Sequence, residues 1–90
     1  MKRVTAIVYG RVQGVGFRVN AQYEANRLGV QGWVKNQWDG SVKTVAEGPD
    51  MALDRYVAWL QRGPLNARVD RVEQNWSEAM GEFRGFHVRG

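Results

Sequence analysis

Residues 4–36 read VTAIVYGRVQGVGFRVNAQYEANRLGVQGWVKN, and the spacing of their apolar residues changes along the chain. At the start of this stretch, Val4, Ala6 and Val8 recur at every second position. This period is typical of a β-strand with one strongly apolar face. We therefore expect the stretch to open with a strand that ends at Gly10.

The spacing then becomes helical. Apolar residues recur at steps of three or four, as on one face of a helix, at Phe17, Ala21, Ala25 and Leu28. Gly29 follows at the position where a left-handed cap commonly ends a helix. Residues 30–36 read as a second strand. The stretch therefore predicts the order strand, helix, strand.

The remaining elements complete the predicted fold. The turn signal Asp39–Gly40 predicts a hairpin between the second strand and a third strand at 41–47. A second helix is expected to begin at Pro49–Asp50 and to end at Gly63–Pro64. Two further strands are expected at 69–76 and 83–88. This order predicts an α+β fold, the ferredoxin-like βαββαβ plait, in which two helices cover one face of an antiparallel sheet.

Composition limits the classes of protein that remain. The chain has 90 residues, 43% of them hydrophobic, with no cysteine and one histidine. A chain of this length has room for one domain, 1–90, and without cysteine it has neither disulfides nor a thiolate nucleophile. No apolar run long enough for a secretory signal follows the first basic residues, so we expect a soluble, cytoplasmic protein without membrane attachment. We also expect a monomer. The net charge of +4 favours anionic partners without identifying one.

The loop between the first strand and the first helix carries the strongest local motif, GRVQGVGFR at 10–18. Gly14 and Gly16 allow the backbone to curl so that successive N–H groups point inward, and the helix N-terminus adds partial positive charge. Arg18 lies in the first helical turn, where its planar guanidinium can hold a phosphate bidentately. The alternative is that the glycines only permit a tight turn and that Arg18 is solvated.

The predicted topology brings a second polar residue to this loop. In a right-handed split βαβ unit the first two strands run parallel, with the third strand between them. Their C-terminal ends then lie at one edge of the sheet, about 10 Å apart. Asn36, at the end of the second strand, is therefore expected to face the 10–18 loop across a gap that an arginine side chain can span.

Other glycine-loop functions fit the sequence poorly. A Walker A loop needs a terminal Gly-Lys-Ser/Thr, which is absent, and a dinucleotide fingerprint would need glycine where Val19 stands. An RNA-recognition domain shares the plait, and its RNP1 motif loosely resembles residues 13–17. That motif belongs on the third strand, however, and Val15 stands here at the position of its stacking aromatic residue. A non-catalytic anion- or RNA-binding module remains the alternative, although no nucleic-acid partner is expected.

Few other side chains are candidates for chemistry. His87 lies in a terminal strand pattern and is expected to be a surface residue rather than a base. Asp39 is expected to form a turn, while Trp38 in the same turn could border the pocket. One histidine and no cysteine or clustered carboxylates leave no support for a metal centre.

The sequence closely resembles the acylphosphatase family. The resemblance is carried by GRVQGVGFR at 10–18, LGVQGWVKNQWDGSV at 28–42 and AEGP at 46–49, and it continues to FHVR at 86–89. It implies the ferredoxin-like plait, with Arg18 as the phosphate-binding arginine and Asn36 as the asparagine that orients water. One departure is visible, because family members often have a tyrosine after the final arginine, where this chain has Gly90.

The implied reaction is the hydrolysis of an acyl phosphate to a carboxylate and inorganic phosphate. The leaving carboxylate has a reference pKa of about 4, so no general acid is required. Besides Arg18, we expect the backbone N–H groups of the loop to hold the phosphate, at Gln13, Gly14, Val15, Gly16 and Phe17. No cofactor or metal is expected, and inorganic phosphate is expected to be both product and competitive inhibitor.

Overall fold

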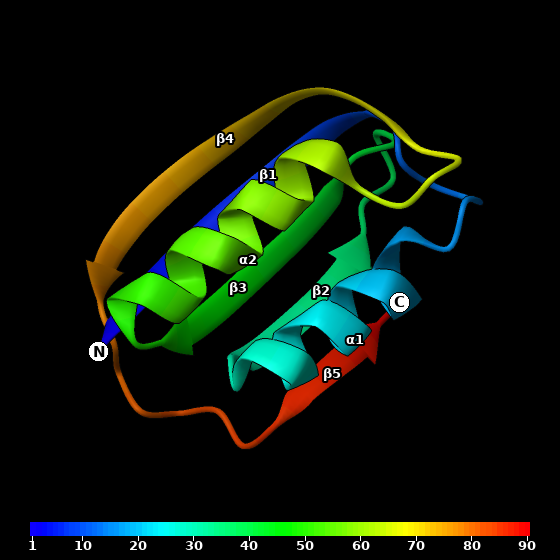
Figure 1. The fold of residues 1–90 in the computed structure, drawn as a ribbon. Coiled ribbons are helices and arrows are strands. Elements are labelled where there is room, and N and C mark those ends of the chain that lie inside the picture. Colours follow the sequence, from blue (N-terminus) through cyan, green and yellow to red (C-terminus); the bar gives the residue numbers. More distant parts are fainter.

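A single sheet with two helices on one face makes up the computed structural model, which describes residues 1–90 (Figure 1). The elements in chain order are β1 (Lys2–Arg11), α1 (Phe17–Leu28), β2 (Gln31–Asn36), β3 (Val42–Gly48), α2 (Asp50–Arg62), β4 (Arg68–Glu78) and β5 (Phe86–Arg89). The predicted α+β plait and its two helices on one face are confirmed. Neither helix is long and apolar enough to cross a membrane.

The strands lie in the order β4-β1-β3-β2-β5. Neighbouring strands are antiparallel from β4 to β2, and the predicted hairpin between β2 and β3 is confirmed, with Trp33 opposite Val45 and Asn36 opposite Val42. The last strand, β5, runs parallel to β2, with Gly32 opposite Phe86. The sheet is therefore mixed rather than wholly antiparallel. β4 runs opposite to β2, so it ends at the end of the sheet where β2 begins (Figure 1). The chain then continues into β5, which runs beside β2 in the same direction.

Element boundaries follow the expected pattern with local differences. The first helix has the predicted limits, and Gly29 caps it with φ 74°. The first strand continues one residue past Gly10, with a shift of register between Tyr9 and Gly10. The strand predicted at 69–76 is present and β4 extends it at both ends, whereas β5 starts three residues later than 83.

The hydrophobic core lies between the helices and the sheet. The alternating residues Val4, Ala6 and Val8 of β1 are completely buried, as their period predicted. Phe17 is also buried and packs on Trp59 of α2, with 5.3 Å between the ring centroids. The first residue of α1 is thus anchored in the core, which fixes the start of the helix and the loop before it.

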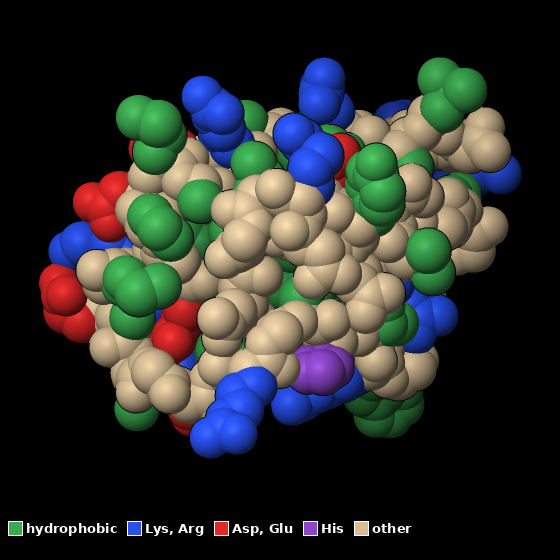
Figure 2. Space-filling model, turned by 60° about the horizontal axis from the view of Figure 1, so that its bottom comes forward, with side chains coloured by type: hydrophobic (Ala, Val, Ile, Leu, Met, Phe, Trp, Pro, Cys, Tyr) green, Lys and Arg blue, Asp and Glu red, His purple; other side chains and the backbone are tan.

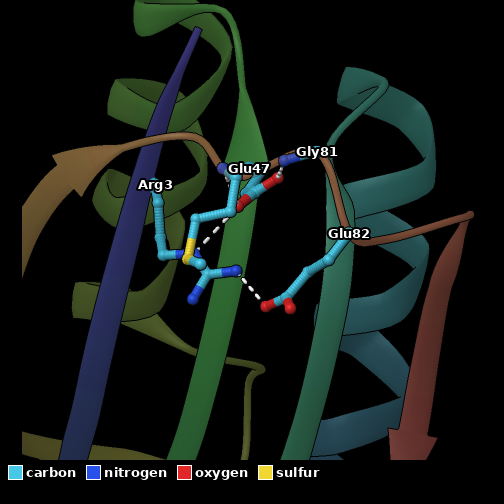
Figure 3. A network of polar contacts seen from close by, with 5 residues as sticks. Arg3, Glu47, Gly81 and Glu82 are labelled. Atoms are coloured by element: carbon cyan, nitrogen blue, oxygen red, sulfur yellow. Dashed lines mark hydrogen bonds and ion pairs between the residues drawn. The ribbon is translucent and has the colours of Figure 1, made fainter.

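The segment that connects β4 to β5, residues 79–85 and here termed the crossover, is fastened to the sheet by one carboxylate. Glu47 at the end of β3 is buried and accepts hydrogen bonds from the N–H groups of Met80 (2.8 Å) and Gly81 (3.0 Å) (Figure 3). It also accepts one from Arg3 Nε at 2.8 Å, and Arg3 in turn pairs with Glu82. The crossover therefore has a fixed path, and this path sets where β5 begins.

Charged side chains are distributed over the surface. On the face shown in Figure 2, Lys and Arg side chains are scattered rather than gathered in one patch. His87 is exposed, and its Nε2 lies 2.7 Å from the carbonyl oxygen of Arg84. The expectation that this histidine is a surface residue is confirmed.

Candidate active site

The loop between β1 and α1 contains two glycines in the left-handed conformation and leads into a helix without a side-chain cap. Gly14 and Gly16 have φ of 73° and 76°, in the left-handed region that other residues adopt only with strain. Gly16 occupies the N-cap position of α1, where no side chain caps the helix, and the first turn contains no acidic residue. The first N–H groups of the helix therefore remain available to an anion, and the helix dipole favours negative charge there.

Side-chain hydrogen bonds brace this loop against the β2–β3 turn. Gln13 Nε2 donates to the carbonyl oxygens of Gln37 (2.5 Å) and Ser41 (2.9 Å), and the neighbouring Val12 is buried in the core. The sequence indicated Gln13 only as a source of a backbone N–H group. Its side chain has the further task of holding the two loops of the site at a fixed separation.

The β2–β3 turn is itself ordered by Asp39, as expected for a turn-forming residue. Asp39 Oδ1 accepts hydrogen bonds from the backbone N–H of Ser41 at 2.9 Å and from its hydroxyl at 2.6 Å. These hydrogen bonds lower the pKa of Asp39 below its usual value, and the bond from the Ser41 hydroxyl has the larger effect. The carboxylate is thus occupied within the turn. Trp38 in the same turn is fully exposed and does not line the pocket.

Arg18 is oriented by the end of the chain. This half-buried residue in the first turn of α1 donates from Nη1 to the carbonyl oxygen of Arg89, at 3.0 Å, and it forms no ion pair. The sequence does not reveal this contact, because a backbone carbonyl carries no residue-type signal. Gly90 lies close by, since a Cβ at this position would be 3.8 Å from the carbonyl oxygen of Asn36. The C-terminal strand therefore borders the site.

Four of the six predicted phosphate-binding residues and Asn36 meet in one small pocket. A cavity of about 100 Å³ is lined by Val12, Gly14, Gly16, Phe17, Arg18, Val19 and Asn36. The cavity has room for a small anion. Gln13 and Val15 are not among the lining residues, and Val15 packs partly against the core. The Gln13 side chain is bonded to the β2–β3 turn, so any contribution of these two residues to anion binding would come from their backbone N–H groups.

A larger cavity lies elsewhere and does not suit an anion. About 470 Å³ in volume, it is found between the start of α2 and the end of β4. Its walls include the carboxylates of Asp50, Asp54 and Glu78 against a single cation, Lys2. Three carboxylates repel a phosphate, so size alone does not identify the site. The chain has no group of three or more His, Cys, Asp or Glu residues placed to hold a metal ion.

The face of the sheet that the helices leave open carries a row of cations near the pocket. Lys43, Lys35 and Arg89 are neighbours across β3, β2 and β5, and none of them forms an ion pair. The Arg89 guanidinium lies 4.9 Å from the centre of the Trp33 ring. Like charges at opposed positions destabilise a sheet. This row therefore adds positive potential beside Asn36 at some cost in stability.

The sequence and fold agree with known proteins over nearly the full chain. Residues 4–88 match the family model described as acylphosphatase. The chain is 51% identical over 88 residues to an acylphosphatase of Salinibacter ruber, which covers 98% of this chain and 93% of that protein. It is 50% identical over 92 residues to an acylphosphatase of Thermococcus kodakarensis, over the whole of both chains.

A solved structure shows the same arrangement of elements. The crystal structure of acylphosphatase from Bacillus subtilis superposes with a TM-score of 0.96 over the whole of both chains, at 38% sequence identity. The family match covers the β1–α1 loop, Arg18 and Asn36 together with all of the helices and nearly all of the sheet. The chain therefore belongs to the acylphosphatase family, whose enzymes hydrolyse acyl phosphates.

Proposed function

We propose that this protein hydrolyses acyl phosphates with Arg18 and the 13–18 backbone holding the phosphate and Asn36 placing the attacking water. The observation that carries the proposal is the pocket of about 100 Å³ that both side chains line, beneath a helix N-terminus without a side-chain cap. Family membership supplies the reaction. The geometry of the pocket supports the assignment of roles.

Phosphate binding rests on the loop and on Arg18 together. The left-handed conformations at Gly14 and Gly16 support a concave row of N–H groups, and these donors need no rearrangement when the anion arrives. Arg18 has five N–H donors, of which one is used by the carbonyl of Arg89. The others are available to the phosphoryl oxygens, and no carboxylate competes for them.

Asn36 supports the attack of water. A carboxamide donates and accepts hydrogen bonds at once, so it can fix a water molecule without placing negative charge beside the phosphate. Asn36 ends β2, beneath the start of α1, and lines the pocket together with Arg18. Because it belongs to a strand and not to a mobile loop, its position is set by the sheet.

The reaction needs little else. The water oxygen forms a bond to phosphorus as the bond from phosphorus to the acyl oxygen breaks, and the carboxylate leaves with the bonding electrons. A carboxylate is a good leaving group near neutral pH, so no residue has to protonate it. The water proton passes to a phosphoryl oxygen, giving inorganic phosphate. Catalysis is then a matter of positioning and charge stabilisation, with no metal ion required.

The test is hydrolysis of benzoyl phosphate by the purified protein with an excess of EDTA. Turnover that is unchanged by EDTA and competitively inhibited by inorganic phosphate is the expected result. Loss of turnover in EDTA with recovery in magnesium would overturn the metal-free mechanism. Binding of phosphate without any turnover would instead identify a non-catalytic anion-binding module.

A further inference from the structure

Two exposed apolar side chains stand beside the phosphate pocket without an assigned role. Val19 and Tyr23, one turn apart on α1, are each 66% exposed. Residues at this spacing are neighbours on a helix surface, so they form one apolar surface, here termed the α1 ledge. Val19 also lines the pocket, which connects the ledge directly to the phosphate site.

Packing does not explain the α1 ledge. The helix buries Phe17, Ala21 and Ala25 in the core, whereas neither residue of the ledge belongs to the core cluster. Two polar side chains beside the ledge are turned to main-chain carbonyls. Asn20 Nδ2 donates to the carbonyl of Gly16 at 2.8 Å, and Gln22 Nε2 donates to that of Phe86 at 2.9 Å. An apolar surface therefore stays exposed next to the site.

The α1 ledge lies on the opposite side of the pocket from Asn36. A helix turns by about 100° per residue, which places Val19 on the side of α1 opposite the buried Phe17. The sheet lies beneath the buried side, and Asn36 belongs to β2, which α1 covers (Figure 1). The pocket is thus bounded by Asn36 on the sheet side and by Val19 of the ledge on the solvent side.

This placement determines where the acyl group of the substrate lies. In phosphoryl transfer the attacking and leaving oxygens are roughly in line through phosphorus. If water approaches from Asn36, as the proposed function requires, the leaving acyl oxygen points away from the sheet. We propose that the α1 ledge is an acyl subsite that takes an apolar, aromatic or branched acyl group. An acyl group as small as acetyl reaches little of this surface.

The test compares two substrates that share the phosphate and differ in the acyl group, benzoyl phosphate and acetyl phosphate. Val19→Thr keeps the shape and β-branching of valine but replaces one methyl with a hydroxyl. A methylene in an enclosed pocket changes specificity by about 10- to 200-fold, and an open ledge gives less. We expect the ratio of kcat/KM for benzoyl phosphate to that for acetyl phosphate to fall about three- to tenfold. The inhibition constant of inorganic phosphate should change less than about twofold.

Two further variants make the test decisive. Tyr23→Ser should lower the same ratio, since it removes the outer half of the ledge. Met51→Thr is the matched control, because Met51 is 68% exposed but lies near the other end of α1, beside Leu28. It should leave the ratio unchanged. Circular dichroism should show that all three variants are folded.

The possible failures are distinguishable. If the unmodified protein hydrolyses both substrates but neither ledge variant lowers the ratio, the acyl subsite is wrong and the proposed function stands. An equal fall in Met51→Thr, or a large rise in the phosphate inhibition constant of Val19→Thr, would also overturn the subsite. If the unmodified protein hydrolyses neither substrate, the proposed function fails and the subsite fails with it.

Discussion

The guanidinium of Arg18 has two roles that a single point charge cannot fill at once. One N–H group bonds the carbonyl of Arg89 at 3.0 Å, while the others are proposed to hold phosphate. A lysine ammonium at this position lacks the fork geometry needed to do both. We therefore predict that Arg18→Lys is nearly as inactive as Arg18→Ala on benzoyl phosphate. Near-normal inhibition of the lysine variant by inorganic phosphate would show that only charge is needed.

Asn36 distinguishes water placement from substrate binding. Asn36→Ala should lower kcat by about 10² to 10³, the scale for removing one preorganised polar group, with little change in the phosphate inhibition constant. Asn36→Asp preserves size but adds negative charge beside a dianion, so it should weaken both turnover and phosphate binding. Steady-state kinetics with phosphate inhibition measure both effects. A loss of affinity with kcat retained in Asn36→Ala would mean that Asn36 binds substrate instead.

At this scale the sequence predicted the side chains that face the pocket and missed those that hold it together. Arg18 and Asn36 could be placed because a glycine loop and a parallel pair of strands have known geometry. The Gln13 side chain and the Arg89 carbonyl could not, because both contacts involve main-chain carbonyls. Val19 and Tyr23 are apolar residues on the solvent side of the predicted helix. This departure from the amphipathic pattern is the only indication of the α1 ledge in the sequence.

Among the elements, the β1–α1 loop contributes through the conformation of its backbone. Gly14 and Gly29 provide a matched pair, since their φ angles are 73° and 74° and a Cβ on either would meet no atom within 4 Å. Replacement by alanine should cost each about 1 kcal/mol of stability through left-handed strain. Only Gly14→Ala should raise the phosphate inhibition constant, by several-fold. Denaturant unfolding and inhibition kinetics measure the two effects, and equal inhibition constants in the two variants would exclude a role for the loop backbone.

The crossover depends on the ionised form of Glu47. Burial alone would raise the pKa of Glu47, but the Met80 N–H and the Arg3 guanidinium outweigh it and hold the pKa below the usual value. A carboxylate with a lowered folded pKa stabilises the protein above its unfolded pKa of about 4.3, and this contribution is lost as pH falls through the folded pKa. Stability should therefore decline below about pH 4.3.

Glu47→Gln tests this fastening directly. At pH 7 the variant should lose about 1 to 3 kcal/mol of unfolding free energy, the scale of hydrogen bonds to a buried charged group. The difference from the unmodified protein should shrink as the pH is lowered below 4. Glu78→Gln is the control, because its pair with Lys2 is exposed and should contribute little. Equal denaturant unfolding curves for the Glu47 variant and the unmodified protein at pH 7 would contradict this account.

Hydrophobic periodicity predicted where the elements lie better than it predicted which strands pair with each other. Periodicity placed β1, α1, β2 and the hairpin with β3, because each has one clear apolar face. It could not give the partner or direction of β5, which has only one buried residue, Phe86. These are set by where β4 ends and by the path of the crossover. That path depends on Glu47, whose contacts join residues 33 and 34 positions apart.

Over the whole molecule, the largest cavity and the row of exposed cations lie in different places, and neither forms the site. The largest cavity, of about 470 Å³, is lined by three carboxylates and is unsuited to phosphate. The cations Lys35, Lys43 and Arg89 lie on the open face of the sheet and offer no enclosed pocket. The small pocket between the start of α1 and the end of β2 combines an uncapped helix N-terminus with Arg18, which forms no ion pair, and with Asn36.

The most direct measurement is a titration of the ¹⁵N-labelled protein with inorganic phosphate, followed by the chemical shifts of all backbone amides. The largest shifts are expected at residues 13–18, and the Arg18 side-chain Nε–H signal should shift with them. Arg18→Ala should abolish the saturable response. The amides of β4 and of the start of α2, beside the acidic cavity, should not shift. Saturable shifts centred on the open face of the sheet, with residues 13–18 unaffected, would contradict the central claim.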